Sequence, residues 1–223
     1  MTDPEPESTD SSLRERIDAW SRDHASDFPE EVQNLFARKT EEVLRSGILD
    51  RCLQEGDRAP DFSLPSVTGE EIRLSEILEK GPVILSFYRG TWCPYCNLEF
   101  VSLLEAMPQF QSRKATVLAI SPQMRNRRED PAILGFHDLC DHDNRVAKEF
   151  GLVHAVGEEI EEVYRNFGIQ LDHLNDSTQG EIPIPATYLI DQDYVIRYAH
   201  ANADIVERAE PSELIGSLVQ LAA

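Results

Sequence analysis

Basic residues, cysteines and long apolar runs are all scarce in this chain of 223 residues. Lys and Arg number 21 against 41 Asp and Glu, so the formal net charge is −20. This excess of acid opposes binding to the phosphates of nucleic acids and of anionic membranes. A helix that crosses a bilayer needs roughly 20 consecutive apolar residues, and the sequence has no such run. We therefore expect neither nucleic acid nor a membrane among the partners.

Four cysteines are too few to build the disulfide framework of a small secreted protein. The first residues, Met1 to Glu5, are acidic, whereas a secretion signal begins with basic residues followed by an apolar segment. We therefore expect a cytoplasmic protein. In that reducing compartment a Cys-x-x-Cys pair indicates redox or metal chemistry.

Composition divides the chain into three parts. Residues 1–12 are rich in Pro, Asp, Glu, Ser and Thr, which predicts a disordered acidic tail. Residues 13–54 carry apolar residues at helical spacing, among them Leu13 and Ile17, which predicts an N-terminal helical extension. We expect this extension to fold back on the rest of the protein or to form the contact of a homodimer. Residues 55–223 have the alternating pattern of an α/β domain.

Buried strands and amphipathic helices alternate along this third part. The apolar runs predict strands at 83–88, 115–121, 136–141, 186–191 and 195–200. The helical patterns cover 98–110, 123–134, 145–150, 158–167 and 211–221. The two last strands form a hairpin, so the sequence predicts a central mixed β-sheet with helices on both faces.

The pair Cys93 and Cys96, in Cys-Pro-Tyr-Cys, lies between a predicted strand and a predicted helix. At a helix start, the positive end of the helix dipole favours the thiolate, which is the nucleophilic form of cysteine. Three residues apart on one helix face, the two sulfurs are close enough to form a disulfide. Pro94 suits the first helical position because it lacks an N–H group there.

Two other interpretations of the pair stay open at this point. Both cysteines could be apolar core residues, or they could form half of a zinc site. Zinc normally takes four ligands, and the remaining candidates are Cys52, Cys140, His137 and His142. Their spacing does not tie them to the pair, so we expect no metal and no organic cofactor.

Several segments together resemble the alkyl hydroperoxide reductase/thiol-specific antioxidant (peroxiredoxin) superfamily. They are Glu-Gly-Asp-Arg-Ala-Pro-Asp-Phe-Ser-Leu at 55–64, Val-Ile-Leu-Ser-Phe-Tyr at 83–88, and the loop from Phe87 to Glu99. The resemblance runs from Glu55 to the C-terminus. It implies a thioredoxin-like fold and a thiol-specific peroxidase that reduces hydrogen peroxide or organic hydroperoxides through a dithiol–disulfide cycle of the Cys-x-x-Cys pair. It also implies thioredoxin or glutaredoxin as the reductant.

The register of the loop decides which thiol attacks first. Aligned without gaps, Cys96 matches the peroxidatic cysteine of this family, Glu99 matches the glutamate after it, and Cys93 replaces a threonine. In this register, which we favour, Cys96 attacks the peroxide and Cys93 condenses with it. The segment from Thr91 through Trp92 to Cys96 is equally similar to thioredoxin and glutaredoxin loops, and in that register Cys93 attacks.

Pro185 marks a second departure from the family pattern. Peroxiredoxins have an arginine at the position of Pro185, whereas thioredoxins have a cis-proline there. We therefore predict a cis peptide bond at Pro185 and contact with the cysteine pair. Arg89, just before the loop, is the candidate to replace the missing cation. A thiol-disulfide oxidoreductase acting through Cys93 is the alternative function, followed by a zinc-binding interaction module.

Overall fold

A five-stranded mixed sheet forms the centre of the protein. The computed structural model describes residues 11–124 and 136–221. The strand order is β5-β4-β3-β8-β9, with β3, β4 and β5 parallel and with β8 and β9 antiparallel to their neighbours. The bounds are β3 Val83–Phe87, β4 Thr116–Ser121, β5 His137–Cys140, β8 Ala186–Ile190 and β9 Ile196–Ala201. The predicted mixed α/β architecture is therefore confirmed.

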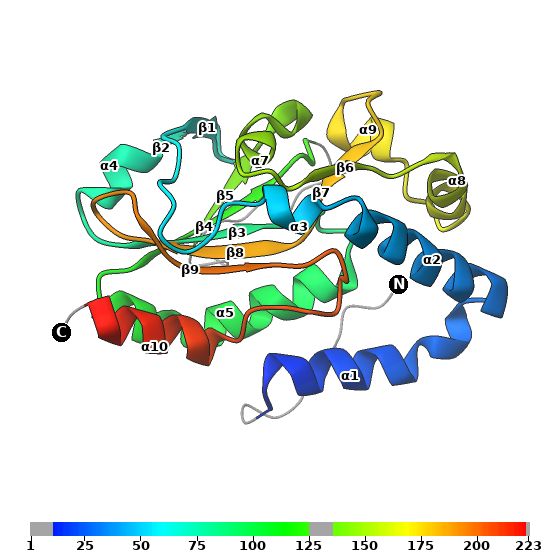
Figure 1. The fold of residues 1–223 in the computed structure, drawn as a ribbon, viewed down its shortest axis with the longest axis horizontal. Coiled ribbons are helices and arrows are strands. Elements are labelled where there is room, and N and C mark those ends of the chain that lie inside the picture. Colours follow the sequence, from blue (N-terminus) through cyan, green and yellow to red (C-terminus); the bar gives the residue numbers. More distant parts are fainter. Residues whose placement is uncertain (1–10, 125–135, 222–223) are drawn as a thin grey trace.

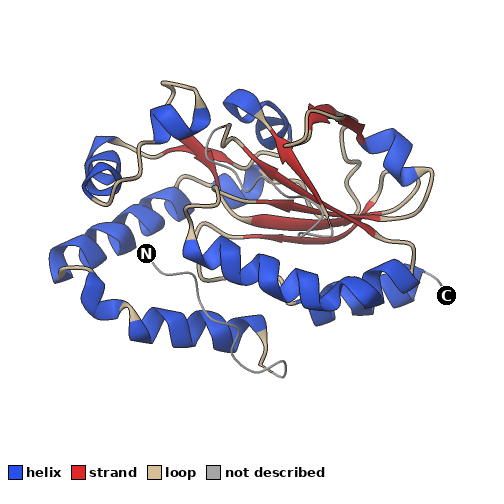
Figure 2. Cartoon of the chain, turned by 180° about the vertical axis from the view of Figure 1, so that it is seen from behind, coloured by secondary structure: helices blue, strands red, loops and turns tan. Residues whose placement is uncertain are grey.

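Helices cover both faces of this sheet (Figure 1). Successive residues of a strand point to opposite faces, so Val83, Leu85 and Phe87 join one core cluster and Ile84 joins the other. The first face packs against α4 (Leu74–Leu78) and α7 (Arg145–Glu149). The second face packs against α5 (Pro94–Ser112) and α10 (Pro211–Leu221), which Figure 2 shows from behind as one layer of helices below the strands.

Short elements at the edge of the domain were harder to predict. The hairpin of β1 (Ser63–Pro65) and β2 (Glu71–Arg73) follows an alternating pattern. The sequence analysis missed the antiparallel pair of β6 (Val153–Ala155) and β7 (Glu181–Pro183), because three-residue strands are too short to show a period. The remaining short elements are η1 Ala25–Asp27, α3 Ile48–Arg51, η2 His142–Asn144, α8 Glu158–Asn166 and α9 Leu171–Asn175.

Some expectations fall on parts of the chain outside the description. The expected tail lies there as far as residue 10, and most of the expected helix at 123–134 does too. Ser12 is described, and it is the N-cap of α1 (Leu13–Asp23). None of the described helices combines the length and the apolar character that crossing a bilayer requires.

Helix α1 folds back on the same chain. Its buried residues Leu13 and Ile17 pack against Leu98 of α5, with Trp20 and Tyr95 at the edge of the cluster. Arg16 forms an ion pair with Glu105 of α5, with 2.7 Å between the nitrogen and the oxygen. Helix α1 therefore lies along α5, on the side away from the sheet (Figure 1).

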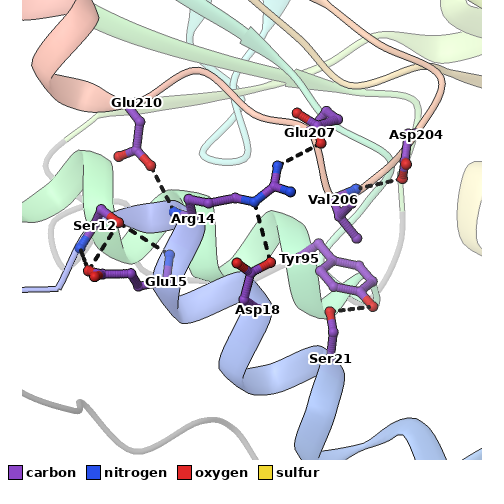
Figure 3. Close-up of polar contacts among 10 residues, drawn as sticks. All are labelled: Ser12, Arg14, Glu15, Asp18, Ser21, Tyr95, Asp204, Val206, Glu207 and Glu210. Atoms are coloured by element: carbon purple, nitrogen blue, oxygen red, sulfur yellow. Dashed lines mark hydrogen bonds and ion pairs between the residues drawn. The ribbon is translucent and has the colours of Figure 1, made fainter.

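The start of α1 also holds the segment before α10 (Figure 3). The Glu210 carboxylate accepts hydrogen bonds from the backbone N–H groups of Leu13 at 3.1 Å and Arg14 at 2.8 Å. The Arg14 side chain pairs with Glu207 at 2.6 Å. The first N–H groups of a helix have no partner within it and favour a negative charge. Glu210 therefore caps α1 and links it to the segment 204–210.

Helix α2 (Glu30–Arg45) extends the N-terminal segment toward α8. Phe36 packs on the cluster that contains Ile160 and Tyr164 of α8. Lys39 and Arg38 both pair with Glu159, at 2.8 Å and 3.0 Å. These ion pairs are exposed and contribute little stability, so apolar packing is the main contact between α2 and the domain.

We expect the Ile17→Ala variant to unfold with a free energy lower by about 2 kcal/mol, because it leaves a cavity between α1 and α5. Urea denaturation followed by circular dichroism measures the change. The matched control is Arg22→Ala on the exposed side of the same helix, which should change stability by less than about 0.5 kcal/mol. Equal stability of the two variants would contradict the packing of α1 on α5.

Candidate active site

The loop between β3 and α5 places the two cysteines at a helix start. Gly90 has a φ of 145°, which strains residues with a side chain, and a Cβ there would lie 2.3 Å from Trp92 Nε1. Cys93 is the N-cap of α5, and Pro94 is its first residue. The prediction that the pair begins a helix directly after a central strand is therefore confirmed.

Thr91 and its neighbours fix the shape of this loop. The Gln123 Oε1 atom accepts hydrogen bonds from the Thr91 backbone N–H at 2.7 Å and from its hydroxyl at 3.2 Å. The Asn97 side chain donates to the Thr91 carbonyl at 3.1 Å. Thr91 thus positions the loop through Gln123, which follows β4 and which the sequence analysis did not single out.

Both thiols are buried, with exposures of 1% for Cys93 and 0% for Cys96. Burial opposes ionisation of Cys93, but the hydrogen bond from the Cys96 thiol and the charges of Arg89 and Arg208 lower the pKa of Cys93 to about 5. Burial, the same hydrogen bond and the Cys93 charge raise the pKa of Cys96 well above its usual range, against the effect of Arg208. One thiolate, on Cys93, is therefore favoured in the reduced pair.

Arg89 is the cation beside Cys93, as the sequence suggested. Its side chain is buried, and Nη1 lies 4.0 Å from the Cys93 sulfur. The guanidinium carbon lies 4.6 Å from the centre of the Trp92 ring, and the group donates a hydrogen bond to the Tyr164 hydroxyl. Cation–π contact and this hydrogen bond compensate for the lost hydration of the charge. Trp92 therefore supports the site by holding Arg89.

A second cation, Arg208, lies beside Cys96. Its Nη1 and Nη2 atoms are 3.8 Å and 3.7 Å from the Cys96 sulfur. Its side chain is only 2% exposed and forms an ion pair with Glu99, which is equally buried. The sequence analysis missed Arg208, because it lies 112 residues from Cys96 in a loop without a recognisable motif.

Glu99 connects this second cation to the sheet. Its Oε1 atom accepts hydrogen bonds from the hydroxyls of Ser86 in β3 at 3.2 Å and of Thr187 in β8 at 3.0 Å. Its other oxygen pairs with Arg208. Glu99, chosen from the sequence as a supporting residue, thus positions Arg208 against Cys96.

The cis peptide bond expected at Pro185 is absent, since no described peptide bond is cis. The trans form is favoured at proline by about 0.5–1 kcal/mol, and here the chain passes from β7 to β8 without a reversal. The Ile184 N–H donates to the Leu152 carbonyl at 2.9 Å, and the Asn202 N–H donates to the Pro185 carbonyl at 3.3 Å. The cis prediction was therefore wrong, although Pro185 does line the same cavity as Cys93.

This cavity has a volume of about 520 Å³ and lies between the N-terminal helices and the domain. Cys93, Arg89 and Trp92 are at its wall, and Phe36 of α2 also contributes to it. In the part of the chain that the structure describes, Cys96 is not a lining residue. The cavity thus borders Cys93, and Cys96 lies outside its wall.

The other two cysteines, and His137 and His142, do not line this cavity. Cys52 donates a hydrogen bond to the Ile48 carbonyl at 3.2 Å, and burial raises the pKa of Cys52 to about 11. Cys140 ends β5. Within residues 11–124 and 136–221, no three His, Cys, Asp or Glu side chains converge as metal ligands.

Comparison with known proteins gives the family. The AhpC/TSA family model matches residues 55–199. A relative from Buchnera aphidicola, which carries the name peroxiredoxin Bcp, is 35% identical over 120 residues. The match covers 52% of this chain and 73% of that protein. The peroxiredoxin Bcp of Escherichia coli (strain K12) is 32% identical over 103 residues, covering 45% of this chain and 65% of that protein.

Solved structures support the same fold. The crystal structure of the peroxidoxin BcpB from Mycobacterium tuberculosis has a TM-score of 0.59 at 22% identity, covering 77% of this chain and 99% of that one. Its likeness confirms the thioredoxin-like arrangement of sheet and helices. The chain therefore belongs to the AhpC/TSA family and is a peroxiredoxin-like thiol oxidoreductase.

Proposed function

We propose that this protein reduces hydroperoxides through a dithiol–disulfide cycle in which Cys93 attacks first and Cys96 resolves. The observation that carries the proposal is the placement of Cys93 at the N-cap of α5 and at the wall of the cavity, with Cys96 outside that wall. The alignment register favoured the opposite order. Geometry supports Cys93, because among the described residues the cavity is lined by Cys93 and not by Cys96.

In the first step, the Cys93 thiolate attacks the terminal oxygen of the hydroperoxide. A sulfur–oxygen bond forms and the oxygen–oxygen bond breaks, so Cys93 becomes a sulfenic acid and the peroxide is reduced to an alcohol or water. The departing oxygen takes up a proton. Arg89, with Nη1 at 4.0 Å from the Cys93 sulfur, stabilises the thiolate before attack.

In the second step, Cys96 attacks the sulfur of the sulfenic acid, a disulfide forms, and water leaves. Oxidation of Cys93 removes the negative charge that raises the pKa of Cys96. Arg208, whose two Nη atoms contact the Cys96 sulfur, then favours the Cys96 thiolate. Each arginine thus serves mainly one step of the cycle.

A dithiol protein of the thioredoxin or glutaredoxin type is the reductant in this proposal. Thiol–disulfide exchange with it returns both cysteines to the reduced form. The reducing cytoplasm, where such a reductant keeps thiols reduced, is the proposed site of action. A homodimer is a further expectation, which mass measurement in solution tests.

One observation also favours a thiol–disulfide oxidoreductase as a second candidate. A low-pKa cysteine at the start of a helix, followed by a resolving cysteine at the third position after it, suits the reduction of disulfides. Both functions use Cys93 first. Rates of peroxide consumption and of insulin disulfide reduction by the same preparation distinguish them.

The order of attack is tested with single serine variants and one equivalent of peroxide, without reductant. We expect Cys96→Ser to consume the peroxide and to accumulate a sulfenic acid at Cys93, which dimedone labels and mass spectrometry locates. Cys93→Ser should consume almost none. A dimedone adduct at Cys96 in Cys93→Ser would instead support the order of the alignment.

The pH dependence of alkylation tests the role of Arg89. In Cys96→Ser, where a hydroxyl can still donate to Cys93, the iodoacetamide rate should rise with pH through about 5 and then level off, since only the thiolate reacts. Adding Arg89→Met should move this midpoint upward by roughly 1–3 units, because an opposite charge is lost. Arg45→Met, on the exposed surface of α2, serves as control and should leave the midpoint unchanged.

Substitution of Arg208 tests the second step. Removing only Arg208 leaves Glu99 buried without its cation, so we use the double variant Arg208→Gln/Glu99→Gln and compare it with Glu99→Gln alone. The double variant should form the sulfenic acid but close the disulfide at least about tenfold more slowly, as one pKa unit implies. Disulfide closure is measured as the loss of free thiols after peroxide is added. An unchanged rate of closure in the double variant would contradict this role.

A further inference from the structure

The contact between Arg208 and Cys96 requires accurate placement of the arginine. Its Nη1 and Nη2 atoms lie 3.8 Å and 3.7 Å from the Cys96 sulfur, and the same group pairs with Glu99. Such contacts weaken quickly when the donor turns away from its acceptor, and the attraction between charges falls with distance. A small displacement of Arg208 would therefore change the reactivity of the Cys96 thiol.

The loop that carries Arg208 has no regular structure. Residues 202–210, between β9 and α10, form neither a helix nor a strand. The Asn202 side chain accepts a hydrogen bond from the Asp204 N–H at 3.0 Å, and the Asp204 side chain accepts one from the Val206 N–H at 3.2 Å. These bonds shape the first half of the loop, before Arg208. The position of Arg208 itself therefore depends on contacts from outside the loop as well.

Helix α1 supplies contacts on both sides of Arg208 (Figure 3). The Arg14 side chain pairs at 2.6 Å with Glu207, one residue before Arg208. The N–H groups of Leu13 and Arg14 donate to the Glu210 carboxylate at 3.1 Å and 2.8 Å, two residues after Arg208. The start of α1 thus holds the chain directly before and directly after this arginine.

The same contacts occupy two carboxylates that could compete for Arg208. Glu207 and Glu210 are one and two residues away from it, and a carboxylate is a strong partner for a guanidinium. Both carboxylates are engaged by the start of α1 instead. The guanidinium of Arg208 therefore remains with Glu99 and the Cys96 sulfur.

Helix α1 has a cap of its own besides Glu210. The Ser12 hydroxyl accepts a hydrogen bond from the Glu15 N–H at 3.2 Å, and the Glu15 side chain accepts one from the Ser12 N–H at 2.8 Å. This reciprocal pair is a capping box, which stabilises the first turn of a helix. Packing on α5 covers the apolar side of α1. The helix should therefore persist when Glu210 is replaced, so its link to the loop can be tested separately.

We propose that α1 holds Arg208 in place for the resolving step, with Glu210 as the main positioning residue and Arg14 as the second. The inference rests on the proposed function, because that step is the attack of Cys96 on oxidised Cys93. The family model matches residues 55–199. Both α1 and Arg208 lie outside this range, so the positioning contact joins two parts of the chain that the model does not cover.

The test uses 4,4′-dithiodipyridine in place of a peroxide. The Cys93 thiolate attacks one sulfur of this reagent, the sulfur–sulfur bond of the reagent breaks, and one thiopyridone leaves as a mixed disulfide forms. Cys96 then attacks the Cys93 sulfur, and the second thiopyridone leaves as the Cys93–Cys96 disulfide forms. With one equivalent of reagent, stopped-flow absorbance records the two releases as two phases.

Glu210→Ala should slow the second phase at neutral pH by at least about threefold, since a displaced cation stabilises the attacking thiolate less. Burial, Cys93 and Glu99 raise the pKa of Cys96, and Arg208 lowers it. The midpoint of the second phase against pH should therefore move upward, by roughly 0.5–1 unit. The first phase should change by less than about twofold, because Cys93, with a pKa of about 5, stays ionised at neutral pH.

Glu105→Ala is the matched control. It removes the 2.7 Å ion pair with Arg16 that joins α1 to α5, and it leaves the Arg208 loop untouched. Both phases should keep their rates in this variant. Equal slowing of the second phase in Glu105→Ala and Glu210→Ala would overturn the proposal, because it would show a loss of stability in α1 alone. An unchanged second phase in Glu210→Ala, or equal slowing of both phases, would overturn it as well.

A double-mutant cycle tests whether Glu210 acts through Arg208. Glu210→Ala, added to Arg208→Gln/Glu99→Gln, should slow the second phase by less than about twofold more, because the positioned cation is already gone. Further slowing as large as in the wild-type background would overturn the proposal. If the wild-type chain consumes no peroxide, the proposed function fails, whereas the two thiopyridone phases still show whether α1 positions Arg208.

Discussion

The ion pair of Arg208 and Glu99 lies in the interior, where both side chains are only 2% exposed. Burying two charges is costly unless further hydrogen bonds satisfy them. Ser86 and Thr187 supply such bonds to Glu99 from two adjacent strands. Arg208 donates from Nε to the Ile205 carbonyl and from both Nη atoms to the Cys96 sulfur. The central sheet, the start of α5 and the segment before α10 must therefore meet at one point, and α1 holds that segment in place through Glu210.

Each sulfur of the cysteine pair has its own neighbouring arginine. A second thiolate next to the first is opposed by charge repulsion, so the reduced pair carries one negative charge that the two sulfurs share unequally. Arg89 lies beside the Cys93 sulfur, at 4.0 Å, and Arg208 lies beside the Cys96 sulfur, at 3.8 Å. Both cations come from places in the chain other than position 185, where the family resemblance implied an arginine and this chain has proline. The trans peptide bond at Pro185 also distinguishes this site from thioredoxin, whose loop the sequence resembles.

The N-terminal segment has two separate structural roles. Helix α1 packs on α5. Its first N–H groups are capped by Glu210, which lies in the same loop as Arg208. The turn after α1, together with α2, closes an apolar cavity over Cys93. The family model matches residues 55–199, so the helices that form this wall lie outside the part of the chain that it covers.

The sequence by itself determined the elements with local signals. The apolar run of β3, the N-cap position of Cys93 and Pro94 at the first turn fix the dithiol at a helix start, and periodicity identified most helices and all five strands of the central sheet. Only the tertiary structure decided which groups surround the sulfurs. Arg208 is 112 residues from Cys96, and the cavity is lined both by the N-terminal helices and by the domain. The backbone at Ile184 and Pro185 bonds to Leu152, just before β6, and to Asn202, just after β9. These contacts are set by packing between distant segments, which leaves no period or motif in the chain.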